Sequence, residues 1–127
     1  FCHSALLYSA GFLIEAFTAP HGPITSEIPH NLAYLINKKL LHPGDSLRVE
    51  GIDHVEVLAL PTFAPWLRGI DMVECAKNLS PKIAIPIHDA FVKDFMLERM
   101  YSSHYGPCLS EAGIELRPLA LSDELKV

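Results

Sequence analysis

Three short motifs constrain the fold of this chain most strongly, because each one closes an apolar, β-rich run. They are Ala-Pro-His21-Gly, His-Pro-Gly-Asp45-Ser and Ile-Pro-Ile-His88-Asp. Proline and glycine interrupt regular structure, so each motif presents a side chain from a turn at a strand end. Two imidazoles and one carboxylate are suitable ligands for zinc or a similar divalent ion. We therefore expect His21, Asp45 and His88 to converge on one cleft.

The segments around these motifs predict alternating strands and helices, which is an α/β pattern. The expected strands are 11–18, 31–36, 40–42, 55–60, 83–87 and 114–121. Apolar residues at helical spacing predict helices at 71–79 and 91–101, with one further turn at 107–112. The polar turn 37–39 makes a hairpin of the strands on either side of it. Strand, helix and strand between 55 and 87 predict a parallel pair with a right-handed crossover.

The composition is that of one globular domain of 127 residues, half of them hydrophobic and 20% charged. A net charge of −5 argues against nucleic acid as a partner. An anionic substrate stays open, because a metal ion can dominate the charge of its own site. No apolar run approaches the roughly 20 residues that span a bilayer, so no membrane partner is expected.

The cysteines Cys2, Cys75 and Cys108 are odd in number and widely spaced. This pattern predicts no disulfide framework and a reduced, cytoplasmic location. We expect no catalytic thiol among them. The chain begins at Phe1 without a signal-peptide pattern, and we interpret it as a piece of a longer protein.

The motifs resemble the carboxy-terminal half of the metallo-β-lactamase superfamily of hydrolases. The similar branch is that of Zn-dependent hydrolases close to the sugar-phosphate lactonases. The resemblance covers nearly the whole chain and is carried by TAPHGPI (18–24), NLAYLI (31–36), LLHPGDSL (40–47), VEVLALPTFAPW (55–66) and KIAIPIHDA (82–90). It implies that residues 1–127 form the C-terminal part of a metallo-β-lactamase-like domain. The implied fold is half of an αββα sandwich, with a mixed sheet and flanking helices.

The resemblance also implies a role for each motif. His21 matches the third histidine of the first metal site, and His88 matches a ligand of the second. Asp45 matches the carboxylate that bridges both metals, which makes it the catalytic centre. In such sites the metals share a hydroxide that attacks the substrate, here an ester, lactone or phosphodiester of a small molecule. Zinc is the expected metal, although manganese and iron accept the same ligands.

The chain departs from this family in one respect. The His-x-His-x-Asp-His motif that completes both metal sites is absent, and no His-x-His occurs anywhere. Each ion would then have two protein ligands, whereas zinc normally uses three or four. We therefore expect the isolated chain to bind metal weakly and to catalyse poorly. The alternative is a non-catalytic, metal-free half-domain for assembly or binding. A nuclease of the same superfamily is disfavoured by the charge.

A half-sandwich would uncover apolar sheet surface, and large exposed patches rarely persist on soluble monomers. We therefore expect a homodimer through that surface. Beside the expected metal site, His42 either supports Asp45 or packs inward from its strand. Ser46 either bonds the carboxylate or caps a turn, and we favour the turn.

Three further residues are expected near the rim of the site. Thr62 and Trp66 follow the strand that ends at Pro61. Trp66 either walls a substrate pocket or serves only in packing. Asp89 either orients His88 or caps the helix that follows, and we favour the cap.

Overall fold

The computed structural model describes residues 4–127 and shows one mixed sheet in which neighbours in space follow the order of the chain. The strands β1 to β4 are antiparallel, and β4 to β7 are parallel. Their bounds are β1 (Ser4–Ser9), β2 (Phe12–Thr18), β3 (Leu32–Ile36), β4 (Leu40–His42), β5 (Val57–Pro61), β6 (Ile83–Ile87) and β7 (Glu115–Leu116). The α/β class, with a mixed sheet and flanking helices, is therefore confirmed.

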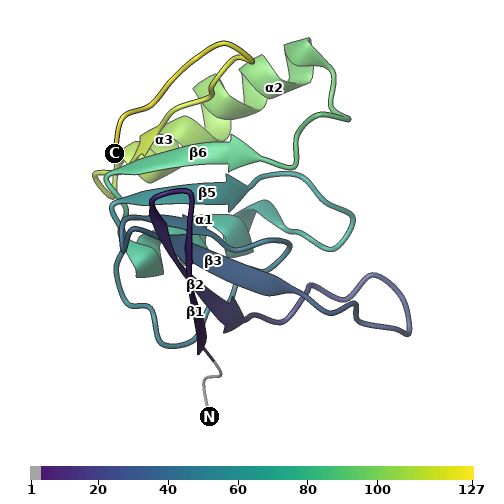
Figure 1. The fold of residues 1–127 in the computed structure, drawn as a ribbon. Helices are drawn as coiled ribbons and strands as arrows, with labels where there is room; N and C mark the ends of the chain where they lie inside the picture. Colours follow the sequence, from purple (N-terminus) through teal and green to yellow (C-terminus); the bar gives the residue numbers. More distant parts are fainter. Residues whose placement is uncertain (1–3) are drawn as a thin grey trace.

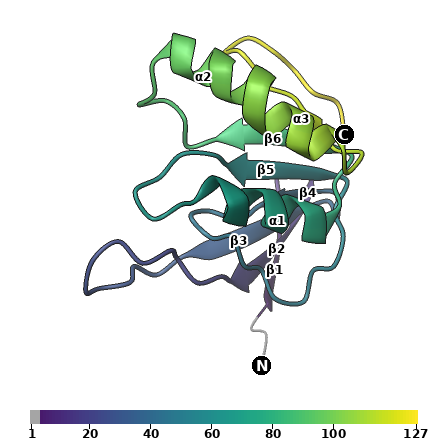
Figure 2. The ribbon, with the colours of Figure 1, turned by 180° about the vertical axis from the view of Figure 1, so that it is seen from behind.

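The helices lie on one face of this sheet. Helix α1 (Gly69–Leu79) connects β5 to β6. The helix α2 (Asp94–Met100), the π-helical segment η1 (Tyr101–Tyr105) and the helix α3 (Gly106–Ser110) follow one another without a break. Figure 1 shows α1 and α3 behind the strands, and Figure 2 shows them in front after a half turn. The opposite face carries no helix in either view.

The core lies between the sheet and these helices. Leu58 and Leu60 of β5 are fully buried together with Met72 of α1 and Leu109 of α3. All five residues of β5 are buried, as expected for a near-continuous apolar run in the middle of a sheet. The sequence VLALP thus forms a buried inner strand, and the loop that carries Thr62 and Trp66 follows it.

Most of the expected elements are present. The strands expected between 11 and 87 correspond to β2 through β6, and the helix expected at 71–79 is α1. The β3–β4 hairpin and the parallel β5–β6 pair are also confirmed. The helix expected at 91–101 starts later, at Asp94, and helical structure continues through η1 and α3 to Ser110.

Two expectations need correction at the ends of the sheet. The strand expected at 114–121 is wrong beyond Leu116, because Pro118 has no N–H to donate to a neighbouring strand. The strand β1 was not anticipated. It pairs with β2 through a turn at Ala10 and Gly11, both with positive φ (48° and 84°). Ala-Gly is a weak signal for a turn in which Asn-Gly or Asp-Gly is usual.

Two further findings concern the cysteines and the length of the helices. Within 4–127, Cys75 is a buried free thiol and Cys108 an exposed one, while Cys2 lies outside the described residues. None of the helices in this part of the chain combines the length and apolar character needed to cross a membrane.

Candidate metal centre

His21, Asp45 and His88 lie together at one edge of the sheet. His21 Nε2 is 3.2 Å from Asp45 Oδ2, and His88 Nε2 is in direct contact with Asp45 Oδ1. The topology explains this convergence. β2 and β4 are each antiparallel to β3 and are therefore parallel to one another, and β4, β5 and β6 are parallel. The carboxyl ends of β2, β4 and β6 consequently share one edge, where α/β proteins place their sites.

Asn31 joins the first two loops of this site. Its Nδ2 donates to the carbonyl oxygens of Ala19 (3.1 Å) and Pro43 (3.0 Å). Its Oδ1 accepts the backbone N–H of Asp45 at 2.9 Å. One side chain therefore ties the loop that carries His21 to the loop that carries Asp45. Sequence analysis missed Asn31, because its only local signal was a polar residue at the start of a strand.

The residues that flank Asp45 stabilise its turn. The Nδ1 of His42 accepts the N–H of Gly44 at 3.1 Å, and the His42 side chain is exposed. The inward-packing alternative for His42 is therefore wrong. The buried Ser46 Oγ donates to the Arg48 carbonyl (2.8 Å) and accepts the Arg48 N–H (2.9 Å). Those two bonds close a turn, which is the interpretation favoured from the sequence.

The hydrogen bonds of His21 define which of its nitrogens faces Asp45. Its Nδ1 contacts the carbonyl oxygen of Gly22, and a carbonyl only accepts, so Nδ1 carries the hydrogen. In the neutral ring the lone pair of Nε2 then points at the Asp45 carboxylate. Two acceptors in that position require a proton or a cation between them. His21 is buried, with 8% of its surface exposed, which strengthens that requirement.

The side chains of His21, Asp45 and His88 are of the types that bind a divalent ion, but the distances between them do not suit one. Two imidazole nitrogens and a carboxylate are ligands that zinc accepts. Within residues 4–127, however, no group of three or more His, Cys, Asp or Glu residues is arranged to hold a metal ion. His88 Nε2 and Asp45 Oδ1 are in direct contact, which leaves no room for an ion between these two atoms.

His88 has an unusual backbone conformation. Its φ is +68°, in the left-handed region that costs a residue with a Cβ roughly 1–2 kcal/mol. Such strain persists only where surrounding contacts enforce it, and it is concentrated at functional sites. The preceding Ile87 carbonyl accepts the Thr62 N–H at 3.0 Å and the Thr62 Oγ1–H at 3.1 Å.

The Asp89 carboxylate is held by Tyr101 instead of capping a helix. The Tyr101 hydroxyl donates to Asp89 Oδ2 at 2.7 Å and lies 3.0 Å from Thr62 Oγ1. Burial is the largest cause that raises the pKa of Tyr101, so its hydroxyl stays protonated as a donor. The helix α2 starts after Lys93 without any side-chain cap, so the favoured capping role for Asp89 is wrong. Sequence analysis did not identify Tyr101, because it was only the last residue of the helix expected at 91–101.

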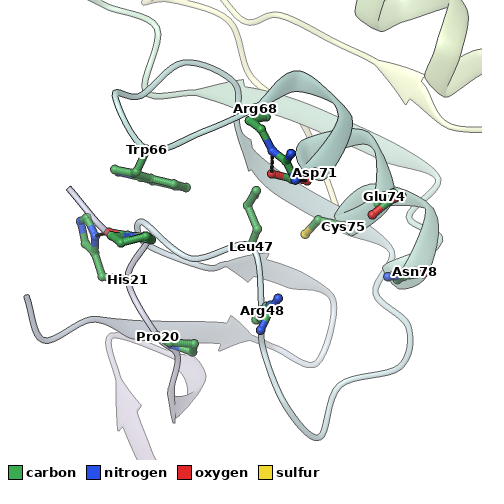
Figure 3. Close-up of a pocket in the computed structure, with 12 residues that line it drawn as sticks. Pro20, His21, Leu47, Arg48, Trp66, Arg68, Asp71, Glu74, Cys75 and Asn78 are labelled. Atoms are coloured by element: carbon green, nitrogen blue, oxygen red, sulfur yellow. Dashed lines mark hydrogen bonds and ion pairs between the residues drawn. The ribbon is translucent and has the colours of Figure 1, made fainter. Parts of the chain in front are cut away.

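A cavity of about 530 Å³ lies beside His21 and Trp66 (Figure 3). Its walls come from α1 and from the loops that follow β2, β4 and β5. Trp66 forms an edge contact with His21, with ring centroids 5.5 Å apart. It also lies so close to Gly22 that a Cβ there would be 2.3 Å from its ring. Trp66 therefore combines both roles considered for it, as a packing residue and as a pocket wall.

Two of the charged residues that line this cavity, Arg68 and Asp71, form an ion pair. Arg68 donates from Nε and Nη2 to the two carboxylate oxygens of Asp71, both at 2.7 Å. Cys75 also lines the cavity, and burial raises the pKa of its thiol to about 11. The thiol of Cys75 therefore stays protonated near neutral pH.

Comparisons with known proteins give one sequence relative and one solved structure of similar fold. No protein-family profile matches the chain. "Protein Rv0786c" of Mycobacterium tuberculosis is 38% identical over 90 residues, which cover 65% of this chain and 42% of that protein. A crystal structure from Parabacteroides distasonis, provisionally named a metal-dependent hydrolase, aligns with a TM-score of 0.58 at 16% identity. That alignment covers 93% of this chain and 56% of the other.

Both comparisons involve longer proteins. The chain spans less than half of its M. tuberculosis relative and little more than half of the solved structure. At 16% identity the structural likeness shows a shared fold, and the activity in the neighbour's name belongs to that protein.

Proposed function

We propose that this chain forms the C-terminal part of a cytoplasmic metal-dependent hydrolase of metallo-β-lactamase type. The observation that supports this most is the meeting of two imidazoles and one carboxylate at the carboxyl edge of the sheet. The provisional name of the solved neighbour points to the same class of activity. Free thiols at Cys75 and Cys108 are compatible with a reducing compartment.

In this proposal His21, Asp45 and His88 hold the metal. A divalent ion such as zinc, if bound there, would supply Lewis acidity and would lower the pKa of water for attack on an ester, lactone or phosphodiester. The chain's own contribution is orientation. The Gly22 carbonyl keeps the hydrogen of His21 on Nδ1, so that Nε2 is the donor atom. Asn31 holds the Asp45 backbone against the His21 loop.

In this proposal the cavity beside Trp66 binds the substrate and determines which substrates are accepted. Its volume of about 530 Å³ lies within the range that binds small molecules. The indole ring supplies an apolar wall next to His21, and it shields one side of the imidazole from water. A small-molecule substrate would place its reacting group at the His21–Asp45 contact and its remainder along this wall.

A second candidate is a metal-free half-domain that acts in assembly or binding. The contacts of Asp45 support it directly, because both carboxylate oxygens already have an imidazole partner. A protonated imidazole would make each contact a stable ion pair without any metal. In that case the motif would serve to join three loops and would have no catalytic role.

Hydrolysis by the full-length protein separates the two candidates. Asp45→Ala is expected to lower hydrolysis of ester, lactone or phosphodiester probes by at least about 100-fold, because the carboxylate anchors the site. A chelator should have the same effect, and added zinc should restore the wild type alone. Asp53→Ala is the matched control, since Asp53 is exposed in the loop after Gly51. Metal-independent activity, or equal activity in Asp45→Ala, would overturn the hydrolase proposal.

A further inference from the structure

We propose that Tyr101 is a positioning residue which, together with Thr62, holds His88 in its left-handed conformation. The inference rests on the proposed function, in which His88 is a metal ligand. It starts from the strain at His88, whose φ of +68° needs external support. That support has to act on the residues adjacent to His88, because the ring itself contacts Asp45.

The two hydroxyl side chains bind the residues on either side of His88. Thr62 engages the Ile87 carbonyl through both its N–H (3.0 Å) and its Oγ1 (3.1 Å). Tyr101 donates to the Asp89 carboxylate at 2.7 Å. The two hydroxyl oxygens lie 3.0 Å apart. His88 is therefore the central residue of a three-residue turn whose two ends are bound to one connected pair of side chains.

A count of hydrogens shows how the pair is ordered. Two hydroxyl hydrogens serve three contacts: Thr62 with Ile87, Thr62 with Tyr101, and Tyr101 with Asp89. The carboxylate only accepts, so the Tyr101 hydrogen belongs to the shortest contact, that with Asp89. The Thr62 hydrogen then goes to the Ile87 carbonyl or to the Tyr101 oxygen. In both arrangements the Thr62 N–H keeps its hydrogen bond to the Ile87 carbonyl oxygen, and the Tyr101 hydroxyl keeps its hydrogen bond to the Asp89 carboxylate.

The helical segment explains how Tyr101 reaches this turn. Tyr101 opens η1, a π-helical insertion between two α-helices, and such insertions are frequent at functional sites. Its ring is held by Phe63 and Tyr105, with centroid distances of 6.3 Å and 6.5 Å. Phe63 adjoins Thr62, so the same loop positions both hydroxyl groups. The aromatic contacts depend on the ring alone and should survive removal of the hydroxyl.

Tyr101→Phe tests the inference, with Tyr105→Phe as the matched control. Tyr105 lies in the same segment, and its hydroxyl makes no hydrogen bond within residues 4–127. Calorimetric titration with Zn²⁺ should show binding at least about 10-fold weaker in Tyr101→Phe than in the control. Nitrogen-15 spectra of labelled histidines should show a shift or broadening of the His88 ring signals while those of His21 stay in place. The melting temperatures of the two variants should be similar.

The nitrogen-15 spectra test the positioning role of Tyr101 without any bound metal. If the wild type binds no zinc, the hydrolase proposal fails, while the displacement of His88 signals in Tyr101→Phe still supports the positioning role. Asp89→Asn should keep the wild-type His88 signals, since its amide oxygen still accepts from Tyr101, and Asp89→Ala should lose them. Unchanged His88 signals in Tyr101→Phe would overturn the inference. Equal changes in His21 and His88 with a lowered melting temperature would do the same, because they indicate general destabilisation.

Discussion

Gly44 shows how a single position shapes the turn ahead of Asp45. Its φ is +62°, and a Cβ there would lie 2.1 Å from Asn31 Oδ1 and 2.9 Å from the Leu32 carbonyl oxygen. The same Asn31 oxygen accepts the Asp45 N–H. Any side chain at this position would therefore push away the group that orients the carboxylate, so glycine is required by space as well as by backbone conformation.

Substitution at this position should affect stability more than an ordinary glycine change. Gly44→Ala combines the left-handed penalty of about 1–2 kcal/mol with the displacement of Asn31. Gly113→Ala is the matched control, because Gly113 has a φ of +76° but a Cβ added there would meet no atom within 4 Å. Urea denaturation should show a larger loss of free energy of unfolding for Gly44→Ala. Equal losses in both variants would mean that the contact with Asn31 is unimportant.

The three motif residues could be predicted from the sequence, whereas the residues that support them could not. Proline and glycine mark strand ends locally, so His21, Asp45 and His88 could be assigned to one edge from the sequence. Asn31 bonds a residue 14 positions away, and Tyr101 bonds Thr62 at a separation of 39. Nothing in the local pattern of either residue reports such a partner. Asp89 was misassigned for the same reason, because an aspartate before a helix is usually a cap.

Among the elements, the central strands were predictable because burial shapes their composition. The strand β5 is buried throughout, and its near-continuous apolar run is typical of a parallel central strand. The edge strands β1 and β7 lack this signal, since residues 5–9 of β1 are exposed and β7 has only two residues. Their existence depends on pairing with β2 and β6, which sequence periodicity does not report.

The helix α1 provides a prediction of pH dependence. Hydrogen bonding from Arg68 lowers the pKa of Asp71, which lies in the first turn of that helix. A carboxyl group with a lowered pKa in the folded state stabilises the protein above its unfolded value of about 3.9. This contribution is lost as the pH falls through the folded value.

Asp71→Asn should therefore lower the melting temperature at pH 7, and the difference from the wild type should shrink as the pH falls toward about 2.5. Thermal melts by circular dichroism at both pH values test this. Both side chains face water, so the effect should also weaken at high salt. A difference that stays constant across this pH range would exclude the Asp71 ion pair as its cause.

Helices cover one face of the sheet, and no helix covers the other face, although Val57 on that second face is itself buried. Residues paired across neighbouring strands point to the same face. One such row crosses six strands and is apolar throughout; its members are Leu7, Ile14, Ile36, Leu40, Val57 and Ile83. These residues alternate with the core residues Leu41 and Leu58, so the row lies on the face without helices (Figure 1).

The predicted homodimer is a proposal about this open face. Leu7 and Tyr34 border a groove there and are 59% and 40% exposed, respectively. Sedimentation velocity should show association of the chain that increases with concentration. Tyr34→Lys should weaken this association, because a charge would be buried between two apolar surfaces. The control Phe95→Lys, at a 66% exposed position on α2, should leave it unchanged. A constant monomer mass at all concentrations would rule out the dimer.

Zinc binding tests the central claim that His21, Asp45 and His88 form one metal site. Isothermal titration of the chain with Zn²⁺ should show weak but saturable binding, because three protein ligands are a minimal set for this ion. Each of His21→Ala, Asp45→Ala and His88→Ala should abolish the binding, whereas His54→Ala, at an exposed loop position, should retain it. Absence of binding in the wild type, or undiminished binding in Asp45→Ala, would contradict the account.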